Sequence, residues 1–298
     1  MCSDERPIEK TSMIEKRKLG QMGYKASIIT LGGCGVGRVD QAVADRYIEL
    51  ALEYGVNMID VAPTYGDAEL RLAPWAQKMR GSFFIAEKTR ERSREGAEKA
   101  LNESLAKLGV DKFDLYQMHG IGNMEELETA LGEGGAIEAF KEAQETGLTD
   151  YIGITGHEDM RVLKEALTRQ VFDSVLLPVS LCSMAKPHPQ NDFRPVLEEA
   201  RDQGVSVTAI KAVARGRWPG ERSHGTWYEP SATLGDIELG IRYTLSQENV
   251  ATYSLPCDAG LWGMVLDAAE RFEPMTDVEQ REAVNYAKEQ GFSPLFPM

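Results

Sequence analysis

Cysteine and histidine are scarce in this sequence. The 298 residues include four cysteines and four histidines, and no two cysteines form a CxxC pair. Structural zinc sites and iron–sulfur clusters need closely spaced thiolate or imidazole ligands, so we expect no metal site. Because Cys2, Cys34, Cys182 and Cys257 lie far apart in the chain, we expect reduced thiols in a cytoplasmic protein.

Long apolar runs are also missing. No run approaches the roughly 18 residues of a membrane span, and the charged start of the chain has no apolar core of a signal peptide. The formal net charge is −14, which repels nucleic acid phosphates and anionic lipids. We therefore expect no nucleic acid and no membrane as partners, and we expect residues 1–15 to be flexible.

No proline-, glycine- or serine-rich linker and no repeat divides the chain, which predicts one domain over residues 1–298. Short apolar segments typical of buried strands alternate with segments whose apolar residues have helical spacing. In the helix that ends near Gly55, the predicted buried stripe is Val43, Tyr47, Leu50 and Tyr54. The predicted strands are Ile28–Leu31, Asn57–Asp60, Phe83–Glu87, Asp114–Met118, Tyr151–Ile154, Ser174–Leu177, Val205–Lys211 and Thr252–Leu255.

Eight apolar strands separated by helices favour a closed parallel (β/α)8 TIM barrel. The glycines of "LGGCGVGRVD" do not complete the GxGxxG pattern of an open dinucleotide-binding sheet. We read them as a loop that approaches a bound molecule. A hairpin that turns at Gly20–Gly23 is expected to cap the barrel, and Asp277–Gln290 is expected to form an extra C-terminal helix.

Polar, titratable residues follow the predicted strands at the end where barrel enzymes hold their active sites. Asp60 ends the second strand and Tyr65 lies in its loop, Lys88 ends the third strand, and His119 ends the fourth. Taken singly, each residue has a structural interpretation, such as an ion pair between Asp60 and Lys88. Together, at adjoining strand ends, they favour a catalytic interpretation.

Four segments, "GVNMIDVAPTYGDAE", "FFIAEKT", "DLYQMHG" and "GLTDYIGITGH", resemble the successive motifs of the aldo-keto reductases, in order and in spacing. The closest likeness is to a bacterial and archaeal branch, in which some members add a cysteine-rich ferredoxin-like segment that this chain does not show. The resemblance implies a barrel that reduces carbonyl compounds with NADPH. It also implies a catalytic tetrad of Asp60, Tyr65, Lys88 and His119.

The chemistry of such a tetrad follows from elementary electrostatics. Reduction of a carbonyl needs a hydride, which only a cofactor can supply, and a proton from an acid. A lysine ammonium about 4 Å from a phenol stabilises the phenolate by roughly 4 kcal/mol at an effective dielectric near 20. We therefore expect Lys88 to bring the pKa of Tyr65 from about 10 toward about 7, and Asp60 to keep Lys88 charged. His119 is expected to orient the carbonyl oxygen.

The cofactor region departs from the family pattern. The resemblance implies that Thr155–Gly156 hold the nicotinamide amide, although Gly156 replaces the usual asparagine, and that Gly33, Lys211 and Arg215 bind the cofactor. Leu176 and Ile210 stand where glutamine and an aromatic are usual. Gly263 and Asp267 stand where 2′-phosphate ligands are expected. NADPH is the expected cofactor, and NADH and weakened binding stay open.

The long segment Ala214–Ala232 is expected to be a loop that carries the substrate-binding residues Trp218 and Trp227, or a surface loop packed by its own aromatics. His157 is expected to cap a helix or to lie in a loop. The expected partner is a small carbonyl substrate, and the sequence leaves the oligomeric state open. Two other functions also stay open: a regulatory or binding subunit that retains the tetrad, and a redox-neutral lyase or isomerase.

Overall fold

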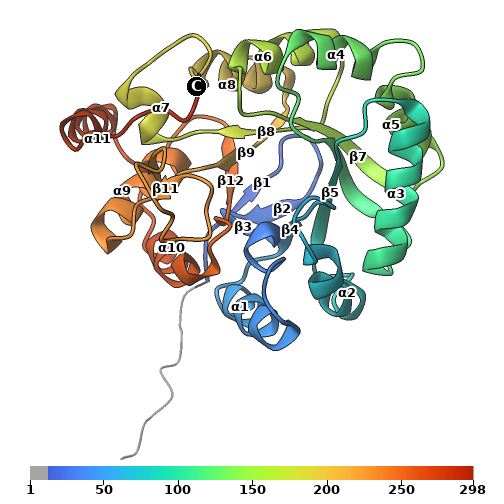
Figure 1. Cartoon of the computed structure of the whole chain (residues 1–298), viewed down its shortest axis with the longest axis horizontal. Coiled ribbons are helices and arrows are strands. Elements are labelled where there is room, and N and C mark those ends of the chain that lie inside the picture. The colour runs from blue at the N-terminus through green and yellow to red at the C-terminus, as the bar shows by residue number, and fades with distance from the viewer. Residues whose placement is uncertain (1–12, 298) are drawn as a thin grey trace, which may run out of the picture.

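Eight parallel strands form a closed barrel in the computed structural model, which describes residues 13–297 (Figure 1). Each predicted strand is present, and the boundaries agree within two residues, so the predicted (β/α)8 barrel is confirmed. Around the barrel the order is β12-β3-β4-β5-β6-β7-β8-β9. The strands are β3 (Ile29–Gly32), β4 (Met58–Asp60), β5 (Phe84–Thr89), β6 (Phe113–Met118), β7 (Thr149–Thr155), β8 (Ser174–Pro178), β9 (Ser206–Ile210) and β12 (Val250–Ser254).

Helices surround the strands on all sides (Figure 1). Their ends follow ordinary capping chemistry: the side chain of Asp40 accepts a hydrogen bond from the N–H of Val43, and Ser93 does the same for Gly96. The helices are α1 (Gln41–Glu53), α2 (Ala68–Lys78), α3 (Arg94–Leu108), α4 (Met124–Leu131), α5 (Ala136–Glu145), α6 (Met160–Arg169), α7 (Leu181–Ala185), α8 (Arg194–Gln203), α9 (Leu234–Leu245), α10 (Trp262–Glu270) and α11 (Asp277–Glu289). The extra C-terminal helix is α11, as predicted.

The buried face of α1 agrees with the predicted stripe only at Tyr54, a buried residue just beyond the last helical position. Ala44, Ile48 and Ala51 are fully buried against the barrel, whereas Tyr47 and Leu50 are only partly buried. Two alanines on the inner face let the helix approach the strands closely. The larger residues Tyr47 and Leu50 pack along the side of the helix. A prediction that assigned the largest apolar residues to the inner face was therefore off by about one residue.

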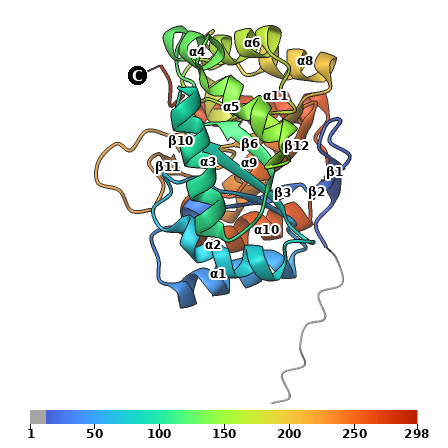
Figure 2. The ribbon, with the colours of Figure 1, turned by 90° about the vertical axis from the view of Figure 1, so that its right-hand side faces the viewer.

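A two-stranded hairpin, β1 (Lys16–Lys18) and β2 (Lys25–Ser27), closes one end of the barrel (Figure 2). Leu19 and Met22 from its turn are buried among strand residues that point into the barrel, which include Phe84 and Leu115. The hydroxyl of Tyr151 donates to the carbonyl of Met22 over 2.6 Å. The predicted hairpin cap is therefore confirmed. Part of the segment predicted to be flexible, residues 1–12, lies outside the described residues.

The segment after β9 is longer than an ordinary barrel loop and carries its own small sheet. β10 (Ala214–Gly216) pairs with β11 (Glu229–Pro230) in antiparallel fashion, so the segment expected to be a loop has regular structure at both ends. Between these strands the chain projects from the end of the barrel opposite the hairpin (Figure 2). This is the end at which the strands finish.

Cys34 and Cys257 form a disulfide, although they are 223 residues apart in the chain. The expectation of reduced thiols is therefore wrong for this pair. Cys34 follows β3 and Cys257 follows β12, and these two strands are neighbours where the barrel closes. Closure of the sheet brings the two loops together, so the pairing cannot be read from sequence spacing. Cys182 is free and buried, and Cys2 lies outside the described residues.

Within residues 13–297, no helix combines the length and the apolar character that crossing a membrane requires. In the same part of the chain, no three histidine, cysteine or acidic side chains are grouped as metal ligands.

Candidate active site

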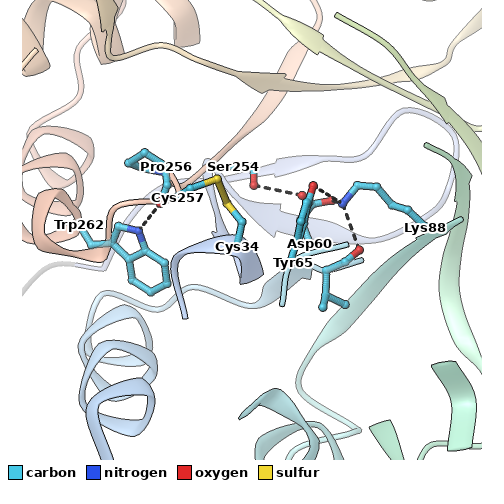
Figure 3. The surroundings of a disulfide bond; sticks show 9 residues. Cys34, Asp60, Tyr65, Lys88, Ser254, Pro256, Cys257 and Trp262 are labelled. Atoms are coloured by element: carbon cyan, nitrogen blue, oxygen red, sulfur yellow. Dashed lines mark hydrogen bonds and ion pairs between the residues drawn. A yellow bond between two sulfur atoms is a disulfide. The ribbon is translucent and has the colours of Figure 1, made fainter. Parts of the chain in front are cut away.

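Lys88 lies inside the barrel mouth, and its amine has three partners. Its Nζ is 2.6 Å from Oδ1 of Asp60, donates to the hydroxyl of Tyr65 over 3.3 Å, and donates to the carbonyl of Val61 over 3.1 Å. Only 1% of the lysine is exposed. Figure 3 shows the lysine reaching across from β5 to the two side chains that β4 and its loop present. A buried ammonium needs such partners to stay charged.

Asp60 is held in place from a third strand. The hydroxyl of Ser254, at the end of β12, lies 3.3 Å from Oδ2 of Asp60, while Oδ1 faces Lys88 (Figure 3). Asp60 is also paired in register with Gly32 of β3. Ser254 was not predicted as a site residue, because its role depends on β12 lying next to β3 in the closed barrel.

Tyr65 is placed by the turn that follows β4. Its N–H donates to the carbonyl of Ala62 over 3.0 Å, and its backbone packs against Gly37, where a Cβ would lie only 1.7 Å from the carbonyl oxygen of Tyr65. Burial raises the pKa of Tyr65, Lys88 opposes this, and Asp60 adds to it. The expected pKa near 7 is therefore wrong for the protein without ligands. Desolvation outweighs the ammonium, and the phenol keeps its proton.

His119 lies beside Tyr65 as a neutral imidazole. The two rings meet edge to face, with centroids 5.7 Å apart. Burial, and then the charges of Lys88, Arg90 and Arg92, lower the pKa of His119 to about 2. The backbone N–H of His119 donates to Thr89 at the end of β5. A neutral ring can donate one hydrogen bond to an oxygen placed between it and Tyr65.

Glu87 is a buried carboxyl directly behind Lys88. It is fully buried, and its Oε1 accepts a hydrogen bond from the backbone N–H of Lys88 over 2.8 Å. Burial raises its pKa to about 8. Adjacent strand residues point to opposite faces, so Glu87 faces the helix layer and not the barrel mouth. Its hydrogen bond holds the backbone of Lys88 from the helix side of the barrel wall.

Lys211 is buried at the end of β9 with an unpaired amine. It is 5% exposed, and its Nζ has no hydrogen-bond partner among residues 13–297. The ring of Trp227 lies 4.8 Å from this nitrogen and the ring of Phe296 lies 5.9 Å from it. Desolvation lowers the pKa of Lys211 to about 7. The backbone of Lys211 has a positive φ of 66°, which is rare for a residue with a side chain.

The other predicted cofactor residues have structural partners of their own. The hydroxyl of Thr155 accepts from the N–H of Gly120 over 2.7 Å. A Cβ on Gly156 would lie 2.6 Å from the carbonyl of Ile121, so close packing explains this glycine.

Gly33 and Arg215 are similarly engaged. Gly33 packs against the second barrel loop, where a Cβ would lie 3.0 Å from the carbonyl of Asp60. Arg215 donates to the carbonyl of Gln290 over 3.1 Å and lies over the ring of Phe292. These contacts turn Arg215 toward α11 and the segment after it.

Trp218 and Trp227 take different positions in the segment between β10 and β11. The indole N–H of Trp218 donates to the carbonyl of Thr226, and its ring stacks on His224. Trp227 is 39% exposed and covers Lys211. It also lies 6.4 Å from the ring of His157 between centroids, so it faces the barrel mouth.

His157 lies in the loop before α6, one of the two expected positions, and does not cap that helix. The cap of α6 is Asp159, whose side chain accepts from the N–H of Arg161. The ring of His157 instead lies 6.0 Å from that of Phe296 and lines the space beside Lys211.

The loop after β12 joins this long segment to the barrel. Oδ2 of Asp258 lies 2.8 Å from Nδ1 of His224 and accepts from the N–H of Gly225 over 3.0 Å. Its neighbour Cys257 bonds to the first barrel loop, and the carbonyl of Pro256 accepts from Trp262 (Figure 3).

At the positions where 2′-phosphate ligands were expected, Asp267 accepts from the hydroxyl of Tyr54. Gly263 has open space around it, since no atom lies within 4 Å of the place of a Cβ.

The family model described as "Aldo/keto reductase family" matches residues 28–252. The chain belongs to the aldo/keto reductase family. It is 30% identical over 217 residues to an uncharacterized oxidoreductase, YqkF, of Bacillus subtilis, which is 68% of this chain and 66% of that protein. It is also 30% identical over 242 residues to L-galactose dehydrogenase of Arabidopsis thaliana, with 74% of this chain and 72% of that protein covered.

A solved structure shows the same fold. The aldo-keto reductase AKR11C1 of Bacillus halodurans in its holo form superimposes with a TM-score of 0.72 at 24% identity, with 92% of this chain and 96% of that chain covered. As an aldo/keto reductase, the protein is an oxidoreductase of a family that uses NAD(P)H on small carbonyl substrates.

Proposed function

We propose that this aldo/keto reductase reduces an aldehyde or ketone to an alcohol with NADPH, and that Tyr65 donates the proton. The observation that carries the proposal is the buried amine of Lys88, which lies 2.6 Å from Asp60 and 3.3 Å from the hydroxyl of Tyr65. A lysine in this position stabilises the phenolate that remains after proton transfer. A solely structural ion pair would not need a phenol at hydrogen-bond distance.

The four side chains have different roles in the proposed reaction. When bound, a reduced nicotinamide would supply the hydride for the carbonyl carbon. Tyr65 gives its proton to the carbonyl oxygen, and water later returns one. Lys88 stabilises the phenolate, and Asp60 fixes the ammonium in place. His119, neutral because its pKa is about 2, donates a hydrogen bond to the same oxygen and orients it.

The residues around Lys211 fit a cofactor that carries phosphates. A buried amine without a partner is costly unless a ligand supplies the counter-charge, and a pyrophosphate would do so. Trp227 covers this amine and is partly exposed, so it has room to move aside. At the two positions expected to hold the 2′-phosphate, Gly263 and Asp267 supply no positive charge. NADPH is proposed because this cofactor prevails in the family, with NADH as the alternative to test.

The deciding experiment compares Tyr65→Phe with Tyr286→Phe, which removes an exposed hydroxyl on α11. We expect Tyr65→Phe to lower kcat for a panel of aldehydes by about 10²- to 10⁴-fold, the usual contribution of a general acid. Affinity for NADPH, measured by quenching of tryptophan fluorescence, should stay within about twofold. An active Tyr65→Phe enzyme would refute the proposed acid. Failure of the wild type to bind either NADPH or NADH would instead favour a binding subunit or a redox-neutral enzyme.

A further inference from the structure

A cavity of about 280 Å³ opens beside His119 and is not used by the tetrad. It lies between the loops that follow three consecutive barrel strands, β5, β6 and β7. Its walls are formed by Arg90, Arg92, Gly120, Gly122, Glu126, His157 and Glu158. Gly120 in this wall directly follows His119, so the cavity adjoins the tetrad on its charged side.

One cation that lines this cavity, Arg90, has no counter-charge among residues 13–297. Lys88 is paired with Asp60, and Arg92 is paired with Glu126 over 3.1 Å while it also donates to the carbonyls of His119 and Gly120. The guanidinium of Arg90 has no hydrogen bond or ion pair with any residue in the described part of the chain. Arg90 is exposed to solvent, so its guanidinium is accessible to a charged ligand.

The position of Arg90 relative to His119 is fixed by the backbone. Nη2 of Arg90 lies 3.7 Å from the place that a Cβ on Gly120 would take, and Gly120 directly follows His119. Gly120 has a φ of +69°, a conformation that glycine adopts without strain. The guanidinium of Arg90 thus lies beside the residue that follows His119, and we infer that one small molecule can reach both groups.

The acidic residues of the cavity do not cancel this charge at His119. Glu126 is engaged by Arg92. The carboxylate of Glu158 lies over Gly122, 2.8 Å from the place that a Cβ would take there. Its negative charge raises the pKa of Lys211. By contrast, the positive charges of Arg90 and Arg92 both lower the pKa of His119. The end of the cavity that adjoins the tetrad is therefore positive.

We propose that Arg90 binds a carboxylate of the substrate, so that the substrates are oxo acids: compounds that carry an aldehyde or ketone and a carboxylate a few bonds apart. The guanidinium offers a planar pair of N–H donors that matches a carboxylate in a bidentate arrangement. A carboxylate there is anchored while the carbonyl oxygen lies between Tyr65 and His119. This inference rests on the proposed carbonyl reductase function and names its substrate class.

The test uses 4-oxobutanoate and its methyl ester, which keeps the aldehyde and the chain but replaces the charged carboxylate with a neutral ester that is one methyl group larger. We expect the wild type to prefer the acid, and Arg90→Gln to lower kcat/KM for the acid by about 10- to 100-fold, which equals roughly 1.4–2.8 kcal/mol. For the ester, the same variant should change kcat/KM by less than about twofold. Arg46→Gln, which removes an exposed positive charge from α1, is the matched control and should alter neither value. Glu158→Gln should keep the preference for the acid or increase it.

A binding measurement separates this inference from the proposed function. Succinate, which has the carboxylates without a reducible carbonyl, should bind to the wild type in calorimetry and lose about 10-fold or more in affinity in Arg90→Gln. If the protein binds succinate through Arg90 but reduces nothing, the anion site stands and the reductase proposal fails. If the ester is reduced as well as the acid, or if Arg90→Gln lowers both equally, the anion site is refuted while the reductase proposal stands.

Discussion

The hydroxyl of Tyr65 lies 3.3 Å from the amine of Lys88, yet burial of the phenol outweighs the ammonium and raises the pKa of Tyr65. The lysine therefore does not make the tyrosine a strong acid before the substrate binds. In the proposed mechanism it limits the cost of desolvation and stabilises the phenolate only as the proton leaves. This is the arrangement expected when stabilisation is directed at the transition state rather than the ground state.

Replacement of Asp60 by asparagine should shift the pH dependence of catalysis. The carboxylate raises the pKa of Tyr65, so its removal lowers that pKa, and the acid form is then lost at lower pH. For the wild type, kcat/KM for reduction should fall only above about pH 10, the ordinary pKa of tyrosine. In Asp60→Asn the fall should begin at lower pH. Profiles measured from pH 6 to 11 test this.

Two controls accompany that measurement. Asp67→Asn removes an exposed carboxylate from the same loop region and should leave the profile unchanged. Asp60→Asn also leaves a buried ammonium without its partner, which costs about 3–5 kcal/mol of stability, so its unfolding must be measured in parallel. A high-pH limb at the wild-type position in a folded Asp60→Asn enzyme would show that Asp60 does not act on the phenol.

Lys211→Met should stabilise the free protein and weaken cofactor binding. The lysine is buried without a partner, and desolvation lowers its pKa to about 7. The unfolded chain, with a lysine pKa of about 10.4, binds more protons between pH 7 and 10. Wild-type stability should therefore rise with pH across this range, and the variant should lack that rise. We expect a gain of about 1–2 kcal/mol at pH 7 in denaturant titrations.

Cofactor affinity supplies the second readout for Lys211. If the ammonium holds the phosphates, affinity of the wild type for NADPH should fall as pH rises above about 7, because the free amine loses its proton there. Lys211→Met should bind more weakly at pH 6 and show no such decline. Lys186→Met, which removes an exposed lysine near α7, should behave as the wild type. A pH-independent affinity in the wild type would contradict this role.

Periodicity and motif order were sufficient to predict the strands, the hairpin cap, the extra helix and the approximate position of the candidate site. A strand end at the mouth of a barrel fixes the direction of its last side chain, so Asp60 and Lys88 meet as soon as the barrel closes. Sequence spacing could not predict the contacts between β12 and β3, the last and first strands of the barrel, where the sheet closes. Ser254 reaches Asp60, and Cys34 reaches Cys257, only because β12 lies next to β3.

Burial was the second quantity that sequence reasoning misjudged. The expected lowering of the pKa of Tyr65 counted the nearby charges and neglected desolvation, which has the larger effect. In α1, apolar size pointed to Tyr47 and Leu50, whereas Ala44 and Ala51 face the barrel. Both errors arise because the environment of a side chain depends on how closely other elements approach it.

Reduction of the Cys34–Cys257 disulfide should lower stability without abolishing the fold. The bond closes a loop of 223 residues, and in the chain-entropy description a disulfide contributes about 2–5 kcal/mol, more for longer loops. Both cysteines are partly exposed, so a dithiol reductant can reach them. Thermal unfolding with and without dithiothreitol should show a lower Tm after reduction. A Cys34→Ser/Cys257→Ser double variant should match the reduced protein and respond no further. An equal effect of dithiothreitol on that variant would assign the change to something other than this bond.

Glu87→Gln should make the protein more stable above neutral pH. The carboxyl is fully buried, and burial raises its pKa to about 8, compared with about 4.3 in the unfolded chain. The folded state therefore binds more protons than the unfolded state between these values, and wild-type stability declines as pH rises from about 4.5 to 8. A glutamine keeps an acceptor for the N–H of Lys88 and cannot ionise, so its stability should not decline in this window. Urea titrations at pH 5, 6.5 and 8 would reveal the difference, with the exposed Glu91→Gln as the control. The Glu91→Gln control should lose stability with pH as the wild type does. If Glu87→Gln does so too, Glu87 is not the group that titrates.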